Sequence, residues 1–487
     1  MNLKLYNLFK GGLVVLLALE GLSLLEWILF PYASAGGMII ARLDAGFFDA
    51  VIPFSPLVLL LILYAWVFRG TRFLRRYYPS IDRVLAPFAR NRDRLLRWLE
   101  DPESDATADT HLFQHGRIWL LMAVCYAILL VLTPYRPDLN QAGIPVGIDT
   151  PLYIGWIQQM LAGSLGQAIV YAFGTANHGS RPLLLIPLYL YALVSQTNPV
   201  QILEALPLFL GPLSVVSSYV FIRKGHKSKS IAILASLLVV LSFPLSVGMW
   251  AGYYANWLGL IEVNLFLFSL LSLSGLAWTR QYGIMAASSL ALLLTHPWTW
   301  ALMIVLALAF ALSIWKTDHD RGLLTMIVPL LTTELIVDAA ITYLFAGWGV
   351  ATFVGVRASG SGTSQLVGFW QNLVEGMVYT YNGLLSNSVL LAFAAVAVLG
   401  LKFSDRFDRL LFLWVFVASL GFPFLASYNQ TRVVYDLPIP ILASMGSLLI
   451  ASKFRDNALS MLILALFIMF NANYAIRSAI QLAPAFP

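Results

Sequence analysis

Charge is scarce in this sequence, because charged residues make up only 11% of its 487 positions. Soluble domains carry about 25% charged residues, so a water-soluble fold would need about twice the charge that is present. This shortage excludes an ordinary soluble domain. The net charge of +6 at pH 7 reflects basic loops between hydrophobic segments, and it does not indicate a partner nucleic acid.

The sequence is also poor in cysteine and lacks a clear internal repeat. The single cysteine, Cys125, lies inside an apolar run, so an internal disulfide is excluded. The cysteine content therefore says nothing about the redox compartment. No clear internal repeat is visible, and this lack weighs against transporter folds that are built from repeated halves.

Long hydrophobic runs are what the sequence has in abundance. It is 59% hydrophobic, with a mean hydropathy of +0.79. Each run can cross a hydrocarbon core of about 30 Å, and continuous rather than alternating apolar character indicates helices. The sequence therefore predicts an all-α, polytopic transmembrane helical bundle with about 13 spans, at residues 11–31, 50–69, 117–134, 200–222, 230–247, 257–277, 283–296, 298–315, 323–346, 386–401, 409–426, 437–452 and 458–475.

Lysine and arginine are concentrated in alternate connections, and cytoplasmic loops carry an excess of these residues. We expect the basic connections in the cytoplasm (69–117, 223–229, 316–321, 402–409 and 453–455) and the others outside (135–181, 248–256, 347–385 and 427–436). A span at 183–195 would move loop 223–229 outside, so that piece is expected to be half-buried or interfacial. Residues 283–315 are expected to form a tight hairpin that turns at His296-Pro297.

The chain is expected to divide into four parts. Residues 1–69 hold two N-terminal transmembrane helices, the first retained rather than cleaved as a signal peptide. Residues 70–116 form a cytoplasmic linker that is basic and then acidic. Residues 117–475 form the main transmembrane module, and residues 476–487 form an outer tail.

The first long outer connection carries the most informative carboxylate, Asp149. It precedes Thr150-Pro151, which can start a helix, and the following residues place aromatic and apolar groups on one face, as in an interfacial helix. A helix N-terminus favours an ionised carboxylate, which suits a general base acting on an acceptor hydroxyl or amide. The alternative is that Asp149 only caps the helix.

Four further segments follow in order: Tyr219 to Arg223, Trp250 to Trp257, Thr295-His296-Pro297 and Tyr428 to Tyr435. With the Gly147 to Tyr153 segment before them, they resemble the GT-C superfamily of polyprenyl-phosphate-dependent membrane glycosyltransferases, over roughly residues 117 to 475. This superfamily includes protein O-mannosyltransferases, aminoarabinose transferases and oligosaccharyltransferases. The resemblance implies a polyprenyl-phosphate-linked sugar as donor, a glycan, lipid or protein as acceptor, and Asp149 as the catalytic base of an inverting transfer.

One departure from the family concerns metal binding. Oligosaccharyltransferases carry acidic metal ligands after a Gly-Tyr-Tyr-like stretch, whereas here Ala255-Asn256-Trp257 follows and Glu262 lies deeper. A divalent cation needs several oxygen ligands, including carboxylates. We therefore expect no metal and no other cofactor, although a divalent metal remains an alternative.

A phosphate leaving group needs cationic stabilisation as negative charge develops on it. Arginine suits this role because its guanidinium matches phosphate oxygens. The candidate phosphate-binding residues are Arg432, which is the first choice, with Arg357, Arg181, His178 and His296. The alternatives are lipid-headgroup contacts or local ion pairs for the arginines, and a turn cap for His296.

Aromatic residues are dense in the expected outer connections. The candidate substrate-pocket residues are Tyr153, Trp156, Trp250, Tyr253, Tyr254, Asn256 and Tyr435. Aromatic belts at membrane interfaces produce the same enrichment, so a belt is the alternative. Connection 347–385 includes the Gly- and Ser-rich piece 355–364 and is expected to close over substrates as a lid.

Two carboxylates inside an expected span support a rival function. Glu334 and Asp338 are four residues apart, and each costs about 2.5–3.5 kcal/mol in the membrane unless it faces the protein interior. An ion-coupled transporter or lipid flippase could use them, and a structural membrane protein is a third class.

The expected location is the plasma membrane of a prokaryote, with the active site on the outer face and membrane lipids as neighbours.

Overall fold

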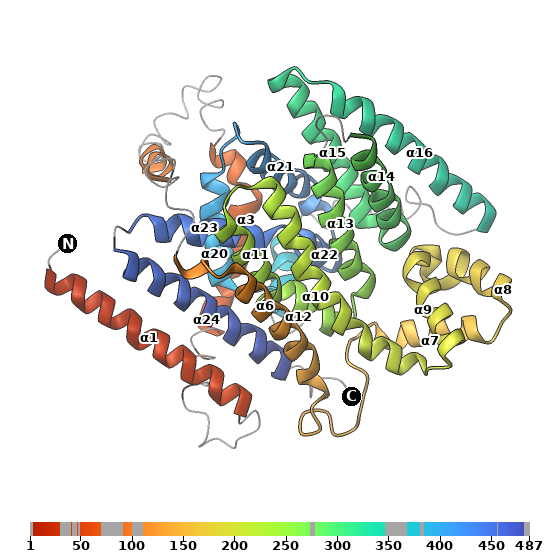
Figure 1. The fold of residues 1–487 in the computed structure, drawn as a ribbon, viewed down its shortest axis with the longest axis horizontal. Coiled ribbons are helices and arrows are strands. Elements are labelled where there is room, and N and C mark those ends of the chain that lie inside the picture. Colours follow the sequence, from red (N-terminus) through yellow and green to blue (C-terminus); the bar gives the residue numbers. More distant parts are fainter. Residues whose placement is uncertain are drawn as a thin grey trace.

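The computed structural model describes most of the chain as helices. It covers residues 3–29, 40, 46, 49–69, 91–99, 111–272, 278–345, 368–379, 384–454 and 456–481. Within these residues there is no β-strand, which agrees with the expected all-α class. Figure 1 shows the long helices running roughly side by side, with a small group of short helices, α7 to α9, at one corner of the bundle.

Nine helical segments of the described residues are long and apolar enough to cross a membrane. They are Tyr6–Leu29, Gly116–Tyr135, Pro199–Gly225, Lys229–Ala251, Tyr254–Ser272, Pro297–Asp318, Gly322–Phe345, Arg406–Phe424 and Asn457–Ile480. Each corresponds to one of the 13 expected spans. The chain is therefore a polytopic helical membrane protein.

The four remaining expected spans are shorter or broken. Residues 50–69, 283–296 and 386–401 contain apolar helices of 10–17 residues, which are Asp49–Leu63, Tyr282–Thr295 and Ser388–Gly400. Residues 437–452 lie in α23 (Ile439–Ser452), which follows α22 (Ser427–Asp436) at a 55° bend. Proline at position 438 lacks the backbone donor that a continuous helix needs, so the chain turns there.

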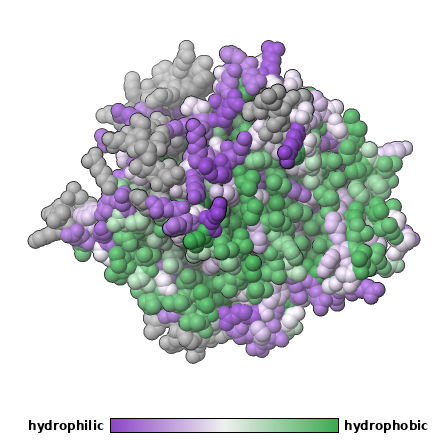
Figure 2. Space-filling model, in the orientation of Figure 1, coloured by the Kyte–Doolittle hydropathy of each residue, from purple (hydrophilic) through white to green (hydrophobic). Residues whose placement is uncertain are grey.

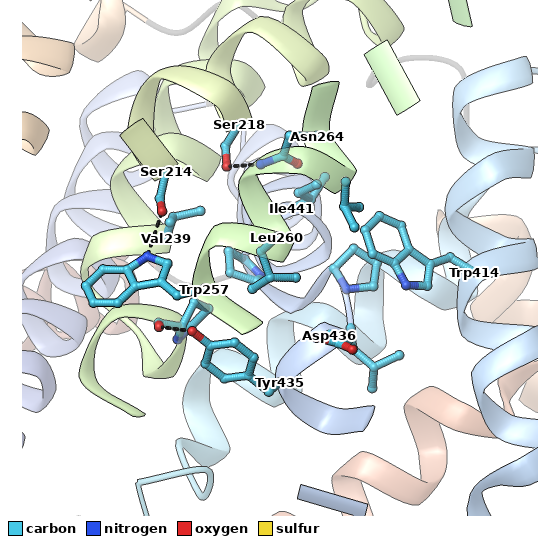
Figure 3. A pocket seen from close by; sticks show the side chains of 15 residues that line it. Ser214, Ser218, Val239, Trp257, Leu260, Asn264, Trp414, Tyr435, Asp436 and Ile441 are labelled. Carbon is cyan, nitrogen blue, oxygen red and sulfur yellow. Dashed lines mark hydrogen bonds between the residues drawn. The ribbon is translucent and has the colours of Figure 1, made fainter. Parts of the chain in front are cut away.

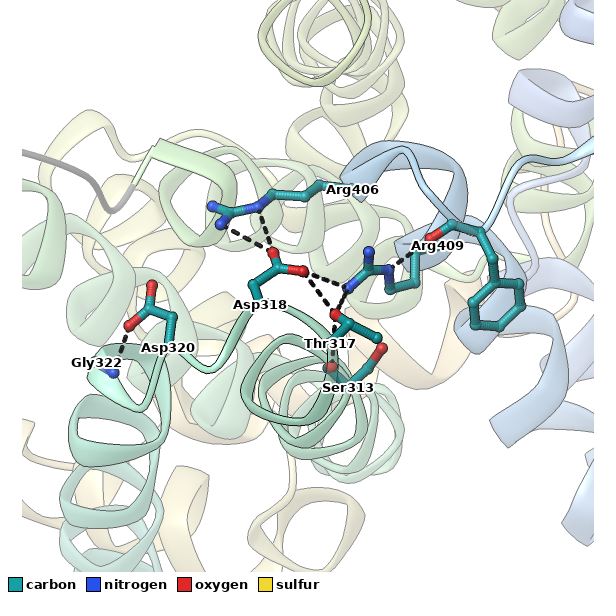
Figure 4. A network of polar contacts seen from close by, with 8 residues as sticks. Ser313, Thr317, Asp318, Asp320, Gly322, Arg406 and Arg409 are labelled. Atoms are coloured by element: carbon teal, nitrogen blue, oxygen red, sulfur yellow. Dashed lines mark hydrogen bonds and ion pairs between the residues drawn. The ribbon is translucent and has the colours of Figure 1, made fainter.

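Three of the basic connections meet at one end of the bundle. Asp318, at the end of α15 (Pro297–Asp318), pairs with Arg406 at 3.0 Å, across the start of α21 (Arg406–Gly421). Arg409 donates to Thr317 at 2.5 Å, and Figure 4 shows both arginines converging on this helix end. The Phe407 ring packs on Gly225, the last residue of α10 (Pro199–Gly225). Three basic connections thus lie together, as the expected orientation requires.

The segment 183–195 forms α9 (Pro182–Ser195), which does not carry the chain between the two ends. Since α10 ends at the basic end with Gly225 and is 27 residues long, it begins at the opposite end, where α9 also lies. This arrangement agrees with a half-buried or interfacial segment. The expected hairpin is also present, because α14 (Trp278–Thr295) and α15 pack together and are joined at His296.

The N-terminal helices pack on the main module. Helix α1 (Leu3–Leu29) lies along α24 (Asn457–Gln481), and α3 (Ser55–Leu63) packs on α20 (Ser388–Gly400). Helix α24 continues through Gln481, beyond the expected start of the tail at 476. Figure 2 shows a broad hydrophobic band across this face of the molecule, with hydrophilic residues on either side, as expected for a protein surrounded by lipid.

Candidate functional site

A polar cavity of about 100 Å³ lies at the end of the bundle opposite the Asp318–Arg406 pair. It is formed where α7 (Thr150–Leu161), α9, α15 and α22 begin or pass close to one another. Its lining residues are Asp149, Leu152, Trp156, Asn177, Ser180, Arg181, His296, Pro297, Trp298, Tyr428 and Arg432. Four residues expected in catalysis or phosphate binding therefore surround one cavity: Asp149, Arg181, His296 and Arg432.

Asp149 is held by its backbone rather than by its side chain. Its amide donates to Ala251 O at 3.1 Å, and the amide of Ile148 donates to Trp250 O at 3.0 Å. Asp149 occupies the N-cap position of α7, but its side chain makes no capping hydrogen bond. The carboxylate is therefore not committed to stabilising the helix, and it lines the cavity instead.

Two glycines let the Asp149 segment approach the end of α12 (Phe243–Ala251). Gly147 has a φ of +108°, and a Cβ there would lie 2.9 Å from Met249 O and would also clash with Thr150 Oγ1. Gly252 has a φ of +66°, and a Cβ there would meet the Asp149 amide nitrogen at 3.0 Å. Both positions thus need glycine for conformation and for space.

We expect Gly147→Ala to destabilise the fold by about 1–3 kcal/mol, because the new Cβ would strain the backbone and clash with a main-chain oxygen. The midpoint of thermal unfolding in detergent measures this loss. Gly155→Ala is the matched control, since it lies inside α7 with no atom within 4 Å of a Cβ. Alanine at 155 should be neutral or slightly stabilising, and equal losses in both variants would contradict the prediction.

The electrostatics around Asp149 combine two opposing effects. Burial raises the pKa of its carboxyl above the ordinary value of 3.8, and the nearby charges of Arg181 and Arg432 act in the opposite direction. The two cations thus partly offset the cost of placing a carboxylate in a half-buried cavity. Asp149 consequently keeps a basicity above that of an exposed aspartate, which a proton acceptor requires.

Arg181 is buried and presents its guanidinium to the cavity. Its side chain is 6% exposed, donates to the Tyr153 hydroxyl, and lies 5.3 Å from the Tyr153 ring centroid and 5.9 Å from that of Trp156. None of the described carboxylates forms an ion pair with it, and its Nε has no hydrogen-bond partner. The cation is therefore supported by aromatic faces and keeps donor capacity for an anion.

Arg432 is supported in the same way from α22. It is 5% exposed, donates to the Tyr428 hydroxyl, and lies 4.4 Å from the Tyr428 ring centroid and 5.1 Å from that of Tyr253. Gly376, in the described end of connection 347–385, packs against Thr431 beside it. The remainder of that connection, including Arg357, lies outside the described residues.

His296 lies at the N-terminus of α15, as the capping alternative anticipated, and it also lines the cavity. Its Nδ1 is 2.7 Å from Thr299 Oγ1 and 3.3 Å from the Thr299 amide nitrogen. His178 differs, because it is exposed and is not among the lining residues. Asn177 and Ser180 line the cavity in its place.

Only Trp156 of the seven expected pocket residues lines this cavity; the other six lie behind it. Tyr153 and Tyr253 support the two arginines. The Tyr254 hydroxyl contacts Thr150 Oγ1 at 2.8 Å, and Asn256 donates to Asp436 at 2.7 Å. Trp250 accepts from Ile148 through its backbone, and Tyr435 donates to Pro244 O. Leu152, Trp298 and Tyr428 also line the cavity but were not among the candidate site residues, although each stands close in sequence to one that was.

The carboxylates on which the transport function or a metal site would depend lie away from the Asp149 cavity. Glu334, in α16 (Gly322–Phe345), accepts from the Trp300 indole at 2.9 Å, and neither it nor Asp338 lines the Asp149 cavity. Among the described residues, no three His, Cys, Asp or Glu side chains are grouped so that they could hold a metal ion. Glu262 instead accepts from Thr295 at 3.0 Å.

No family model matches the chain, and no curated protein sequence matches it.

Proposed function

We propose that this protein is a membrane glycosyltransferase of the GT-C type, which moves a sugar from a polyprenyl-phosphate donor to a glycan, lipid or protein acceptor. The observation that carries the proposal is the convergence of Asp149, Arg181 and Arg432 on one cavity at the end of the bundle away from the basic connections. A base and two cations are the groups that such a transfer needs.

In the proposed reaction, the Asp149 carboxylate takes the proton from the acceptor group. The acceptor oxygen or nitrogen bonds to the anomeric carbon while the bond from that carbon to the phosphate oxygen breaks. The electron pair leaves with the phosphate, and the two guanidinium groups stabilise its growing charge. Attack opposite the leaving group inverts the anomeric centre. One carboxylate is enough because a phosphate, unlike the alkoxide released in glycoside hydrolysis, needs little protonation.

The surroundings of the cavity support a lipid-linked donor. Exposed apolar side chains, Ile148 and Leu152, flank Asp149 at the start of α7, where they can contact the membrane surface. Trp156 and Trp298 line the cavity and offer ring faces to a sugar. Gly376, in the described part of connection 347–385, packs on α22, and we propose that this connection closes over substrates as a lid.

The rate of transfer should fall as the pH is lowered through the pKa of Asp149, since only the ionised carboxylate accepts a proton. Burial raises this pKa above 3.8, so the acid limb should lie at higher pH than that of an exposed aspartate. A pH profile of kcat/KM with saturating acceptor measures it. A profile that stays flat down to the ordinary range of aspartate would contradict the base assignment.

The decisive experiment supplies purified protein in lipid with a panel of polyprenyl-phosphate sugars and tests release of the polyprenyl phosphate. Release that depends on Asp149 supports the proposal. Absence of turnover with every donor, together with proton-coupled uptake or lipid transfer that depends on Glu334 or Asp338, would replace it with the transport function.

The outer location of the site, in a prokaryotic plasma membrane, is part of the proposal. With Cys125 replaced by alanine, single cysteines at the exposed positions Gln141 and Asp320 should react from opposite sides. A membrane-impermeant maleimide added to intact cells should label Gln141→Cys and should leave Asp320→Cys unlabelled until the cells are opened. The reverse pattern would place the cavity in the cytoplasm.

A further inference from the structure

Three consecutive residues at the Asp149 cavity have a left-handed backbone. Asn177, His178 and Gly179 have φ values of +44°, +58° and +73°. Residues other than glycine rarely adopt this conformation, because their Cβ approaches the following carbonyl oxygen. Gly179 needs glycine for space as well, since a Cβ there would overlap Phe173 O. The chain thus tolerates strained backbone at two positions shortly before Arg181, and such strain gathers at functional sites.

Hydrogen bonds close this turn, which we call the Asn177 turn (residues 177–180). Asn177 Nδ2 donates to Ser180 Oγ at 2.7 Å, and Ser180 Oγ donates to Asn177 O at 2.9 Å. The serine hydroxyl uses its single proton in the second bond, so the asparagine amide must be the donor in the first. This fixes the orientation of the amide. Its Oδ1 and its other N–H make no hydrogen bond with the described residues, and Asn177 lines the cavity.

A second cavity contains an amide and hydroxyl groups that are already paired. It has a volume of about 50 Å³, half that of the Asp149 cavity. The amide of Asn264 donates to Ser218 at 3.0 Å (Figure 3). In the same view, the Trp257 indole donates to Ser214 at 2.7 Å. None of its described lining residues is an arginine. Of the two cavities, the one at Asn177 therefore suits a phosphorylated sugar.

The charges that line the Asp149 cavity disfavour a cationic sugar. Arg181 and Arg432 line it, and Asp149 is the single carboxylate among its described lining residues. In the proposed reaction Asp149 takes a proton from the acceptor, so it is not free to pair with an ammonium group on the donor. Such a group would meet two like charges, which opposes binding. The cavity therefore suits a sugar that has hydroxyl groups and no amino group.

We propose that the donor sugar is uncharged and that Asn177 determines its specificity by binding a ring hydroxyl. Asn177 Oδ1 accepts the hydroxyl proton, and the free N–H of the amide donates to a neighbouring sugar oxygen. Arg181 follows four residues later, so the sugar at Asn177 and the phosphate at Arg181 belong to one donor molecule. The strained turn orders the amide before the donor arrives, which lowers the entropy lost on binding. This assignment rests on the proposed function.

The test compares donors that differ in single hydroxyl groups. Farnesyl phosphates of glucose, mannose, galactose and arabinose are offered to the protein in lipid nanodiscs, with the mono-deoxy and amino forms of the best donor. The wild type should prefer the complete sugar to one deoxy form, and to the amino form, by about 10- to 100-fold in kcat/KM. Asn177→Gly should lose the preference at that hydroxyl and keep the others, because glycine adopts the left-handed turn without the amide.

Gln196→Gly is the matched control. Gln196 is exposed, has a φ of +55° and does not line the cavity. Both glycine variants relieve a left-handed backbone, so the unfolding midpoint should stay equal or rise in both. Only Asn177→Gly should change the choice among donors. Wild-type discrimination in Asn177→Gly would remove Asn177 from sugar recognition, and efficient transfer of the amino sugar would overturn the uncharged class.

Binding of the same donors, measured by isothermal titration calorimetry, separates this inference from the proposed function. The sugar donor should bind more tightly than farnesyl phosphate alone, and Asn177→Gly should lose that difference. This binding pattern without transfer of any sugar would refute the transferase and keep the sugar site. Transfer with wild-type discrimination in Asn177→Gly would keep the transferase and refute the sugar site. Neither transfer nor sugar-dependent binding would overturn both.

Discussion

Asp149→Asn should lower kcat for sugar transfer by about 10²–10⁴-fold while the protein stays folded. Asparagine keeps the shape of the side chain but cannot take the proton from the hydroxyl or amide group of the acceptor substrate. The Asp149 side chain makes no capping bond, and the backbone bonds from Ile148 and Asp149 to α12 position the residue. The substitution therefore removes the base without removing the contacts that hold the loop. Single-turnover transfer with a lipid-linked donor, combined with thermal unfolding, measures both quantities.

Linkage gives the sign of the stability change. Because burial raises the folded-state pKa of Asp149, the folded protein is favoured at low pH, and this stability is lost as the pH rises through that pKa. At neutral pH the ionised carboxylate thus opposes folding, and asparagine removes that cost. The unfolding midpoint of Asp149→Asn should consequently be equal to or above that of the wild type.

Asp138→Asn is the matched control, since Asp138 lies in the same connection, is exposed, and pairs with Arg136 at 2.8 Å. An exposed pair contributes about 0–1 kcal/mol, so its loss should affect neither kcat nor folding appreciably. Full activity in Asp149→Asn, or an equal loss in both variants, would remove Asp149 from the mechanism.

Hydropathy and loop charge were sufficient to predict much of the fold. The nine long helices follow from runs whose length matches the membrane, and the contact of Asp318 with Arg406 brings together connections that were grouped by their lysines and arginines. The count of 13 spans is not confirmed. Helix α20 has the composition of a span but extends only from Ser388 to Gly400, and α22 and α23 form a bent pair. Hydropathy averages over such breaks, so it cannot resolve them.

The charged residues of the cavity could be predicted from the sequence, but the packing of the side chains around them could not. Asp149, Arg181, His296 and Arg432 were expected on one side of the membrane, and alternation of the connections is enough to put them there. Whether Tyr153 faces the cavity or lies behind Arg181 depends on the angle between α7 and α9, which no local pattern encodes. Asp436, which accepts from Thr299, was missed for the same reason, because only the fold places the two residues together. The sequence signal that could have found Asp436 was its position directly after Tyr435 and before Leu437-Pro438.

Arg432→Gln should lower kcat by about 10²–10³-fold, as expected when a donor to a developing anion is removed. Arg432→Lys should lose less, because it keeps the charge but not the planar fork. Substitution also removes ring contacts with Tyr428 and Tyr253, so thermal unfolding must be followed alongside activity. Arg477→Gln is the control: it removes another buried arginine, which pairs with Asp49 at 3.1 Å and does not line the cavity. It should leave kcat unchanged.

A double substitution tests whether Arg432 and Arg181 act on the same phosphate. If both guanidinium groups contact one leaving group, the losses in Arg181→Gln and Arg432→Gln should combine less than additively, because the second substitution removes part of an already weakened site. Transfer rates for the wild type, the two single variants and the double variant complete the cycle. Strictly additive losses would mean that the arginines bind separate groups, one on the donor and one on the acceptor. A kcat for Arg432→Gln equal to that of the wild type would exclude Arg432 from stabilising the leaving group and would leave Arg181 as the cation beside Asp149.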